Sequence, residues 1–512
     1  MLILFFLFST CIVGATGEIA CTNLFSRSKV ALWIAACKSQ SRLFWFLFLF
    51  FILSLPFINP IVHGDGVGFY AYARAPLIQH NLHFEEDWRH AHLNFSQAHI
   101  GPDGQLLPEV YTETRYVSNL HSTGPAILWM PFLLVAHFAV LFIRLFGAQI
   151  PANGFSFPYI SAMAIGTAIY GFLGLLLSFS LARKYIGEWY AFLATVGVWF
   201  GSSLPVYMYF NPAWSHAHSA FVVALFIWYW DKTRQERSSR QWLLLGALAG
   251  LMVDVYFPNG IFMLLPLIES LRDYAAALKS AANKAMLLFV GNLFFGLAFL
   301  VTVLPTLISR RIIFGGFLRF GPYLQYTWDW SAPHWREVLF SSDHGLFSWT
   351  PLLFLALCGL VMAPRAAREF SLYLIACSLA FYYVIASYPY WDGMSSFGNR
   401  FFISLTPIFV FGVAAFLNRL ADLFSSIRVA KVACASVVAC FILWNFGLIY
   451  QWGTHLIPVR GPISFREAAY NQFHVVPGDI SSHFRSYFLH RSDMMQQIEQ
   501  RDIEQLKKDA QP

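Results

Sequence analysis

Leu352–Leu360 (LLFLALCGL) and Leu243–Leu251 (LLLGALAGL) decide the fold class, because neither stretch contains a charged side chain. A transmembrane β-strand would show about ten residues of alternating polarity, whereas these runs are continuously apolar. Runs of the same kind recur along most of the chain. The sequence therefore predicts an all-α fold, a polytopic helical membrane protein.

The composition agrees with a bilayer as the solvent. Only 12% of the 512 residues are charged and 57% are hydrophobic, whereas globular domains carry about 25% charged residues. A membrane-spanning helix needs about 20 mainly apolar residues, so we expect about 11 spans. The expected spans are residues 43–60, 125–147, 159–182, 189–209, 214–231, 243–271, 286–308, 346–363, 370–387, 401–417 and 429–451.

The positions of Lys and Arg predict the orientation, because cytoplasmic loops collect basic residues. Segment 26–42 is basic and is expected inside, so the loop at 61–124, here called the first outer loop, lies outside. We divide the chain into a leader and cytoplasmic segment (1–42), a transmembrane domain (43–451) and a short outer tail (452–512).

Segment 125–147 is an exception among the apolar stretches. If it crossed the membrane, the basic loop 231–240 would lie outside, against the rule for positive charge. Pro125 and Pro131 also interrupt the segment. We expect a juxtamembrane or re-entrant helix here, held against protein, where irregular membrane-depth helices are tolerated. The stretch 243–271 is similarly expected to be a hairpin that breaks at Tyr256–Asn259, because Pro258 interrupts the helix.

This sorting uses basic residues alone, yet it places nearly all polar motifs on one face. The expected outer motifs are His63–Gly66, Asn211–His218, Arg310-Arg311, Ser342–Gly345 and Trp391–Gly393. The active face is therefore predicted to be extracytoplasmic.

Asp65 is the first candidate catalytic residue. It follows the first expected span between two glycines and precedes the aromatic pair Phe69-Tyr70. A carboxylate at the membrane surface suits a general base, while the alternative is an ordinary aspartate in a glycine turn.

Four short motifs resemble those of the GT-C glycosyltransferases, the polytopic enzymes that use polyprenyl-phosphate-linked sugars and include protein O-mannosyltransferases and aminoarabinose transferases. The motifs are Gly64–Gly66 with Phe69-Tyr70, His121–Pro125 before Trp129–Phe132, His344–Pro351, and Tyr390–Phe402. The resemblance covers roughly residues 43–420 and implies a bacterial member in the plasma membrane. It also implies a polyprenyl-phosphate-linked sugar as donor, a lipid, glycan or protein as acceptor, and inversion at the anomeric carbon.

The resemblance implies roles for several residues. Asp65 would remove the acceptor's proton, and cations would stabilise the leaving phosphate, for which Arg400 and the Arg310-Arg311 pair are candidates because guanidinium groups bind phosphate bidentately. Arg310-Arg311 could equally be an interfacial anchor at a helix end. Relatives often carry a second acid beside the first, but Gly66 follows Asp65 here, so a two-carboxylate site is in doubt.

Other polar residues are candidates for substrate binding. They are His121, His216, His218, Asp343, His344 and Asp392. Asp343 could instead be a helix N-cap. His216 and His218 would point about 200° apart on a helix, so they do not form a ready-made metal pair. A divalent metal is possible, with ligands unknown.

Two other classes of function remain open. One is a transporter or flippase of lipid-linked or small polar substrates, which would place broken helices at the membrane midplane. The other is a polymerase or ligase of surface polysaccharide. The net charge of +7 mainly reflects topology, so no nucleic-acid partner is expected.

Overall fold

The computed structural model describes residues 41–91, 99–101, 103–235, 237–280, 282–319 and 328–509. The predicted leader lies outside these ranges, apart from its last residues. The described part is helical, and its only strand-like pairings are isolated bridges between Ile100 and Leu106 and between Tyr111 and Val117. By its contacts the chain forms two units, Met1–Ser54 and Leu55–Pro512.

The first unit contributes one described helix, α3 (Arg42–Ser54). This helix is apolar, and side chains such as Ile52 and Leu53 are exposed. Its 13 residues extend only about 20 Å at 1.5 Å per residue, which is shorter than a full membrane crossing.

Six helices in the described ranges have the length and composition needed to cross a membrane. They are α7 (Gly124–Arg144), α8 (Phe157–Tyr185), α13 (Ala282–Phe314), α17 (Arg368–Ala386) together with η7 (Arg365–Ala367), α18 (Thr406–Ala421) together with η8 (Arg400–Leu405), and α19 (Ile427–Gly453). The protein is an integral, multi-pass helical membrane protein.

The remaining expected spans are shorter or broken helices. They comprise α9 (Glu188–Phe200) with η4 (Val206–Phe210), α10 (His216–Thr233), α11 (Ser239–Val255), η5 (Phe257–Met263), α12 (Leu264–Ser280), α15 (Leu346–Trp349) and α16 (Leu352–Val361). The expected break at Tyr256–Asn259 is confirmed, because α11 ends at Val255 and Pro258 lies in the first turn of η5. The count of about 11 continuous spans is thus higher than the number of long helices, since proline and polar residues divide several apolar runs.

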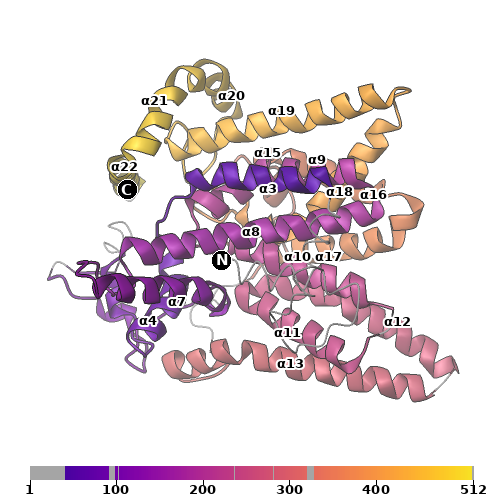
Figure 1. The fold of residues 1–512 in the computed structure, drawn as a ribbon, viewed down its shortest axis with the longest axis horizontal. Helices are drawn as coiled ribbons and strands as arrows, with labels where there is room; N and C mark the ends of the chain where they lie inside the picture. The colour runs from indigo at the N-terminus through magenta and orange to yellow at the C-terminus, as the bar shows by residue number, and fades with distance from the viewer. Residues whose placement is uncertain are drawn as a thin grey trace. The chain divides into compact units, whose positions relative to one another are not determined.

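The core of the second unit forms around α18. In the most apolar stretch of Arg400–Ala421, which comprises η8 and α18, 89% of the residues are buried, against 11% in α13. α18 contacts α8, α9 and α16, and Gly359 of α16 approaches Gly412 of α18 so closely that a side chain on either would meet the other helix's backbone. Small residues allow such close helix packing in membranes. α13 and α19 lie on opposite sides of this core in Figure 1 and expose apolar faces.

Helix α7 packs only along the first part of α8, next to α4 (Figure 1). Trp129 Nε1 donates to Thr167 Oγ1 at 2.8 Å, and His137 lies 2.7 Å from the Tyr159 hydroxyl. The two helices are therefore antiparallel, and the contacts stay near the N-terminal third of α8. This placement fits the expected juxtamembrane helix, although α7 is long enough to cross, so the absence of a crossing stays a prediction.

The first outer loop contains α4 (Asp65–Ile78), α5 (Glu85–Arg89) and η3 (Pro108–Val110). Arg74 is buried and donates to Asp87 through Nε and Nη2, both at 2.6 Å, and to Glu86 at 3.2 Å. Two of the three consecutive acids that follow Asp65 in the chain, Glu86 and Asp87, therefore hold α4 to α5. Burial raises the pKa of Asp87, and the hydrogen bonds from Arg74 oppose that shift.

The C-terminal tail forms α20 (Phe465–His474), α21 (Val476–Leu489) and α22 (Arg491–Asp509). Arg491 donates to the Ile58 carbonyl at 2.6 Å, and the Tyr487 hydroxyl donates to the Phe57 carbonyl at 2.8 Å. The tail is thus attached to the segment that leads to Asp65.

Candidate active site

An ion pair between Asp65 and Arg400 joins two segments that are far apart in the sequence. Arg400 Nη2 lies 3.0 Å from Asp65 Oδ2. Asp65 is the first residue of α4, and Arg400 is the first residue of η8 (Arg400–Leu405). The Arg400 side chain is 8% exposed and that of Asp65 is 42% exposed, so the arginine is held within the protein while the carboxylate is open to a ligand.

Trp214 forms the platform beneath Arg400. The guanidinium carbon lies 4.2 Å from the centre of the Trp214 ring, a cation–π geometry. The indole Nε1 donates to the His63 carbonyl at 3.0 Å. The loop that precedes α10 therefore contacts both the arginine and the segment that leads to Asp65.

The glycines around Asp65 allow the first turns of α4 to approach their neighbours closely. A Cβ at Gly66 would lie 2.5 Å from the Ala213 Cβ, and a Cβ at Gly68 would overlap the ring of His121. The Gly64–Gly68 motif thus reflects packing against two loops as well as turn formation.

His121 lies directly behind this turn and is held from several sides. Its ring centre is 4.3 Å from that of Phe69, and its backbone N–H donates to Asn119 Oδ1 at 3.2 Å. Burial lowers the pKa of His121 to about 4; the nearby Asp65 carboxylate opposes this shift. The imidazole is therefore neutral near pH 7 and can accept or donate a hydrogen bond.

Arg310 fixes the same segment from α13. Its guanidinium is buried and donates to the carbonyls of Asn119 (3.0 Å), Leu120 and His121 (2.8 Å). Arg311 is exposed and donates to the Gly315 carbonyl. Neither arginine contacts the Asp65–Arg400 pair. The Arg310 guanidinium is hydrogen-bonded to backbone carbonyls of residues 119–121, and the Arg311 guanidinium is hydrogen-bonded to the Gly315 carbonyl. Phosphate binding by these two residues stays a prediction, while the structure makes Arg310 a positioning residue for His121.

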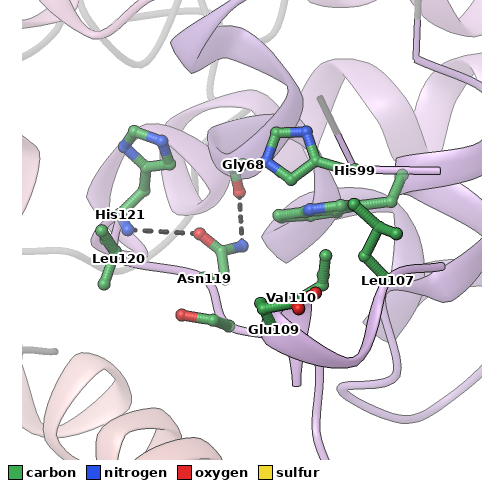
Figure 2. A pocket seen from close by; sticks show the side chains of 10 residues that line it. Gly68, His99, Leu107, Glu109, Val110, Asn119, Leu120 and His121 are labelled. Atoms are coloured by element: carbon green, nitrogen blue, oxygen red, sulfur yellow. Dashed lines mark hydrogen bonds between the residues drawn. The ribbon is translucent and has the colours of Figure 1, made fainter. Parts of the chain in front are cut away.

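A cavity of about 400 Å³ borders Gly68 and His121 (Figure 2). It is lined by Gly68, Trp88, His99, Leu107, Glu109, Val110, Ser118, Asn119, Leu120 and His121. The Asn119 side chain forms part of the cavity wall and donates to the Gly68 carbonyl at 2.8 Å. Sequence reasoning identified only His121 among these residues. The signal it missed was the polar Asn119 two positions before that histidine.

His216 and His218 point in different directions from the first turn of α10, as their spacing predicts. The His216 ring is 4.9 Å from the Tyr207 ring and 6.1 Å from Trp214, so it lies near the Arg400 platform. The His218 ring is 5.0 Å from Trp129, between α7 and α8. Only His216 therefore borders the Asp65–Arg400 pair, and substrate binding by His218 stays a prediction.

Asp343, His344 and Asp392 come together beside Arg400. Their potential ligand atoms lie within 4.8 Å of one another, and His344 Nδ1 is 3.3 Å from Asp343 Oδ1. Burial lowers the pKa of His344 to about 4, with Arg400 acting in the same direction. Burial is the larger cause that raises the pKa of Asp343, and the negative charge of the nearby Asp392 raises it further. Asp343 does not cap α15 with its side chain, because Gly345 is the N-cap residue there.

No protein-family model matches the chain, and no curated protein matches it in sequence. The backbone is similar to two crystal structures of ArnT from Cupriavidus metallidurans. The apo structure has a TM-score of 0.45 and 13% identity, over 84% of this chain and 73% of that chain. The structure bound to undecaprenyl phosphate has a TM-score of 0.41 and 14% identity, over 88% of this chain and 75% of that chain.

Proposed function

We propose that this protein is an inverting glycosyltransferase that moves a sugar from a polyprenyl-phosphate donor to an acceptor at the extracytoplasmic face of the membrane. The observation that carries the proposal is the pair formed by the open Asp65 carboxylate and the buried Arg400 guanidinium, 3.0 Å apart. The motifs shared with GT-C glycosyltransferases support the same reaction class. The distribution of basic residues supports the outer placement.

Asp65 is assigned as the general base. An acceptor hydroxyl or amine attacks the anomeric carbon of the sugar and loses its proton to the Asp65 carboxylate. The bond between that carbon and the phosphate oxygen breaks, and its electron pair stays on the phosphate. Attack from the face opposite the leaving group inverts the anomeric centre.

Arg400 is assigned as the phosphate ligand. Its Nη2 contacts Asp65, whereas its buried Nε has no hydrogen-bond partner among the described residues. A guanidinium presents a planar fork that matches phosphate oxygens. The stack on Trp214 keeps this fork in one orientation, so it is available to the leaving group without reorganisation.

The cavity behind His121 is suited to a small polar ligand. Its volume of about 400 Å³ falls within the usual range for small-molecule sites, about 300–1,000 Å³. Glu109, Asn119 and His121 supply polar groups, and Trp88 supplies an aromatic surface. We assign the cavity to a sugar ring of the substrates.

The test uses full-length protein in liposomes, radiolabelled polyprenyl-phosphate sugars as donors and a bacterial envelope extract as the source of acceptor. Asp65→Asn should lower transfer by about 10²–10⁴-fold, the usual contribution of a general base. Arg400→Lys keeps the charge but loses the fork and the stack, so it should mainly raise KM for the donor. The matched control is Glu113→Gln, since Glu113 is an outer-loop acid whose side chain is 92% exposed. Transfer by Asp65→Asn at the wild-type rate would overturn the assignment.

The same liposomes separate the two other classes. A flippase would move the labelled lipid across the bilayer without breaking the bond between sugar and phosphate. A polymerase or ligase would transfer whole glycans, so its labelled product would be much larger than a single added sugar.

A further inference from the structure

We propose that Asp343, His344 and Asp392 bind one divalent transition-metal ion. The three side chains come from two loops, 341–345 and 388–399, that meet beside Arg400. Their ligand atoms lie within 4.8 Å of one another. This is the one such group of three found among the residues that the structure describes. The inference concerns binding alone and does not depend on the proposed transfer reaction.

The buried imidazole of His344 is the first argument. The side chain is 0% exposed, and the approaches of its ring to Asp343 Oδ1 and to the Asp392 backbone do not reach good hydrogen-bond geometry within the described ranges. Leaving such a group unsatisfied costs about 1–3 kcal/mol. Nδ1 faces Asp343 Oδ1 at 3.3 Å. A metal ion between them would satisfy the ring nitrogen that faces the cluster.

The two carboxylates are the second argument. Asp343 Oδ1 is also buried without a hydrogen-bond partner in the described part of the chain. The Asp343 and Asp392 carboxylates have oxygens within 4.8 Å of each other. Two negative charges this close repel each other unless a cation lies between them. Asp392 Oδ2 accepts the backbone N–H of Met394 at 3.0 Å, which orients this carboxylate and leaves its other oxygen available to a metal.

The positive charge nearest the cluster does not replace a metal. Arg400 lies on the same side, but its Nη2 is paired with Asp65 at 3.0 Å and its guanidinium is stacked on Trp214. The Asp343 and Asp392 carboxylates carry two negative charges, and one divalent cation would balance them. The cluster would then be neutral next to Arg400.

The donor set indicates the class of ion. One imidazole nitrogen and two carboxylate oxygens suit Mn²⁺ or Zn²⁺, whereas Ca²⁺ and Mg²⁺ prefer oxygen ligands alone. Three protein ligands leave coordination positions open for water or a ligand oxygen. The ion would also tie loop 341–345 to the loop that leads to Arg400.

The experiment measures Mn²⁺ binding to the full-length protein in detergent after removal of metals with EDTA. We expect one Mn²⁺ per chain and, in pulsed EPR, a ¹⁴N coupling from the His344 ring. Asp392→Asn and His344→Gln should each weaken binding by about tenfold or more, and His344→Gln should remove the ¹⁴N signal. Zn²⁺ should displace the bound Mn²⁺.

The control is Asp329→Asn. Asp329 forms a similar pair with His334, at 3.5 Å, outside the cluster, so this variant should bind Mn²⁺ like the wild type. Asp392 lies on a partly exposed loop, and the ¹⁴N signal is measured on the wild type, so the test does not require every variant to fold. Absence of stoichiometric binding, or binding that Asp392→Asn leaves unchanged, would overturn the proposal.

Discussion

Gly68→Ala tests whether close packing behind Asp65 positions the candidate site. The added Cβ would overlap His121 Cδ2 and would lie 2.8 Å from its Nε2 and 2.9 Å from Asn119 Oδ1. Neither neighbour can retreat easily. The ring of His121 lies against Phe69, and the backbone carbonyl of His121 accepts a hydrogen bond from Arg310. The Asn119 side chain donates to the Gly68 carbonyl. The substitution therefore has to move the His121 ring or the start of α4.

The size of the effect follows from two opposing contributions. Replacing glycine by alanine within a helix gains about 0.5–1 kcal/mol, and overpacking costs about 1–3 kcal/mol. Gly68→Ala should thus lower the free energy of unfolding by up to about 2.5 kcal/mol. A displacement of about 1 Å in an active site can cost roughly 100-fold in rate, so the loss of activity should exceed the loss of stability.

The assay is thermal unfolding in detergent, followed by fluorescence, together with transfer activity. The matched control is Gly296→Ala, because Gly296 lies within α13 and has nothing within 4 Å of an added Cβ; this variant should be as stable as the wild type or more stable. Introducing Gly68→Ala into a His121→Ala background should reduce the stability cost, since the overlap with the imidazole ring is then removed and only Asn119 Oδ1, at 2.9 Å, stays close to the added Cβ. If Gly68→Ala behaved like Gly296→Ala, or if its cost were unchanged in the His121→Ala background, the packing argument would be refuted.

Two further predictions concern stability. Because the pKa of His121 is lowered from 6.5 to about 4, the unfolded chain binds a proton below pH 6.5 that the folded protein does not, and stability should fall as the pH decreases from 7 to 4; at pH 5 this residue accounts for about 2 kcal/mol. Thermal midpoints measured across this range should therefore decrease less in His121→Gln, and an equal decrease would contradict the assignment. Asp87→Asn should destabilise the fold by up to about 3–5 kcal/mol, because Arg74 then loses its buried charged partner and keeps only Glu86, whose side chain is 54% exposed, whereas Arg74→Met with Asp87→Leu should be much less harmful. Size-exclusion chromatography after heating would show the difference, and similar melting of the single and double variants would contradict it.

The fold class was predictable because hydropathy is a local property of the sequence. The recurrence of continuous apolar runs such as Leu352–Leu360, together with the low charge content, indicates a bilayer and helices, and Pro258 is enough to place a break after α11. Helix lengths were less predictable. The run 189–209 divides between α9 and a short π-helical turn, because backbone geometry at its C-terminal end depends on contacts with other segments.

The candidate site was predictable only in part. The sequence made Asp65 a candidate, since a carboxylate at the membrane surface suits a general base, and the resemblance to GT-C glycosyltransferases added Arg400. Their pairing at 3.0 Å depended on the tertiary structure, because no local pattern relates two loops so far apart in the chain. The contacts of Arg310 were hidden from the sequence for the same reason. Its position at a helix end suggested a phosphate ligand, and only the tertiary structure shows that it donates to the backbone of residues 119–121. Sequence determines which groups are available, whereas packing determines which of them meet and which are already satisfied.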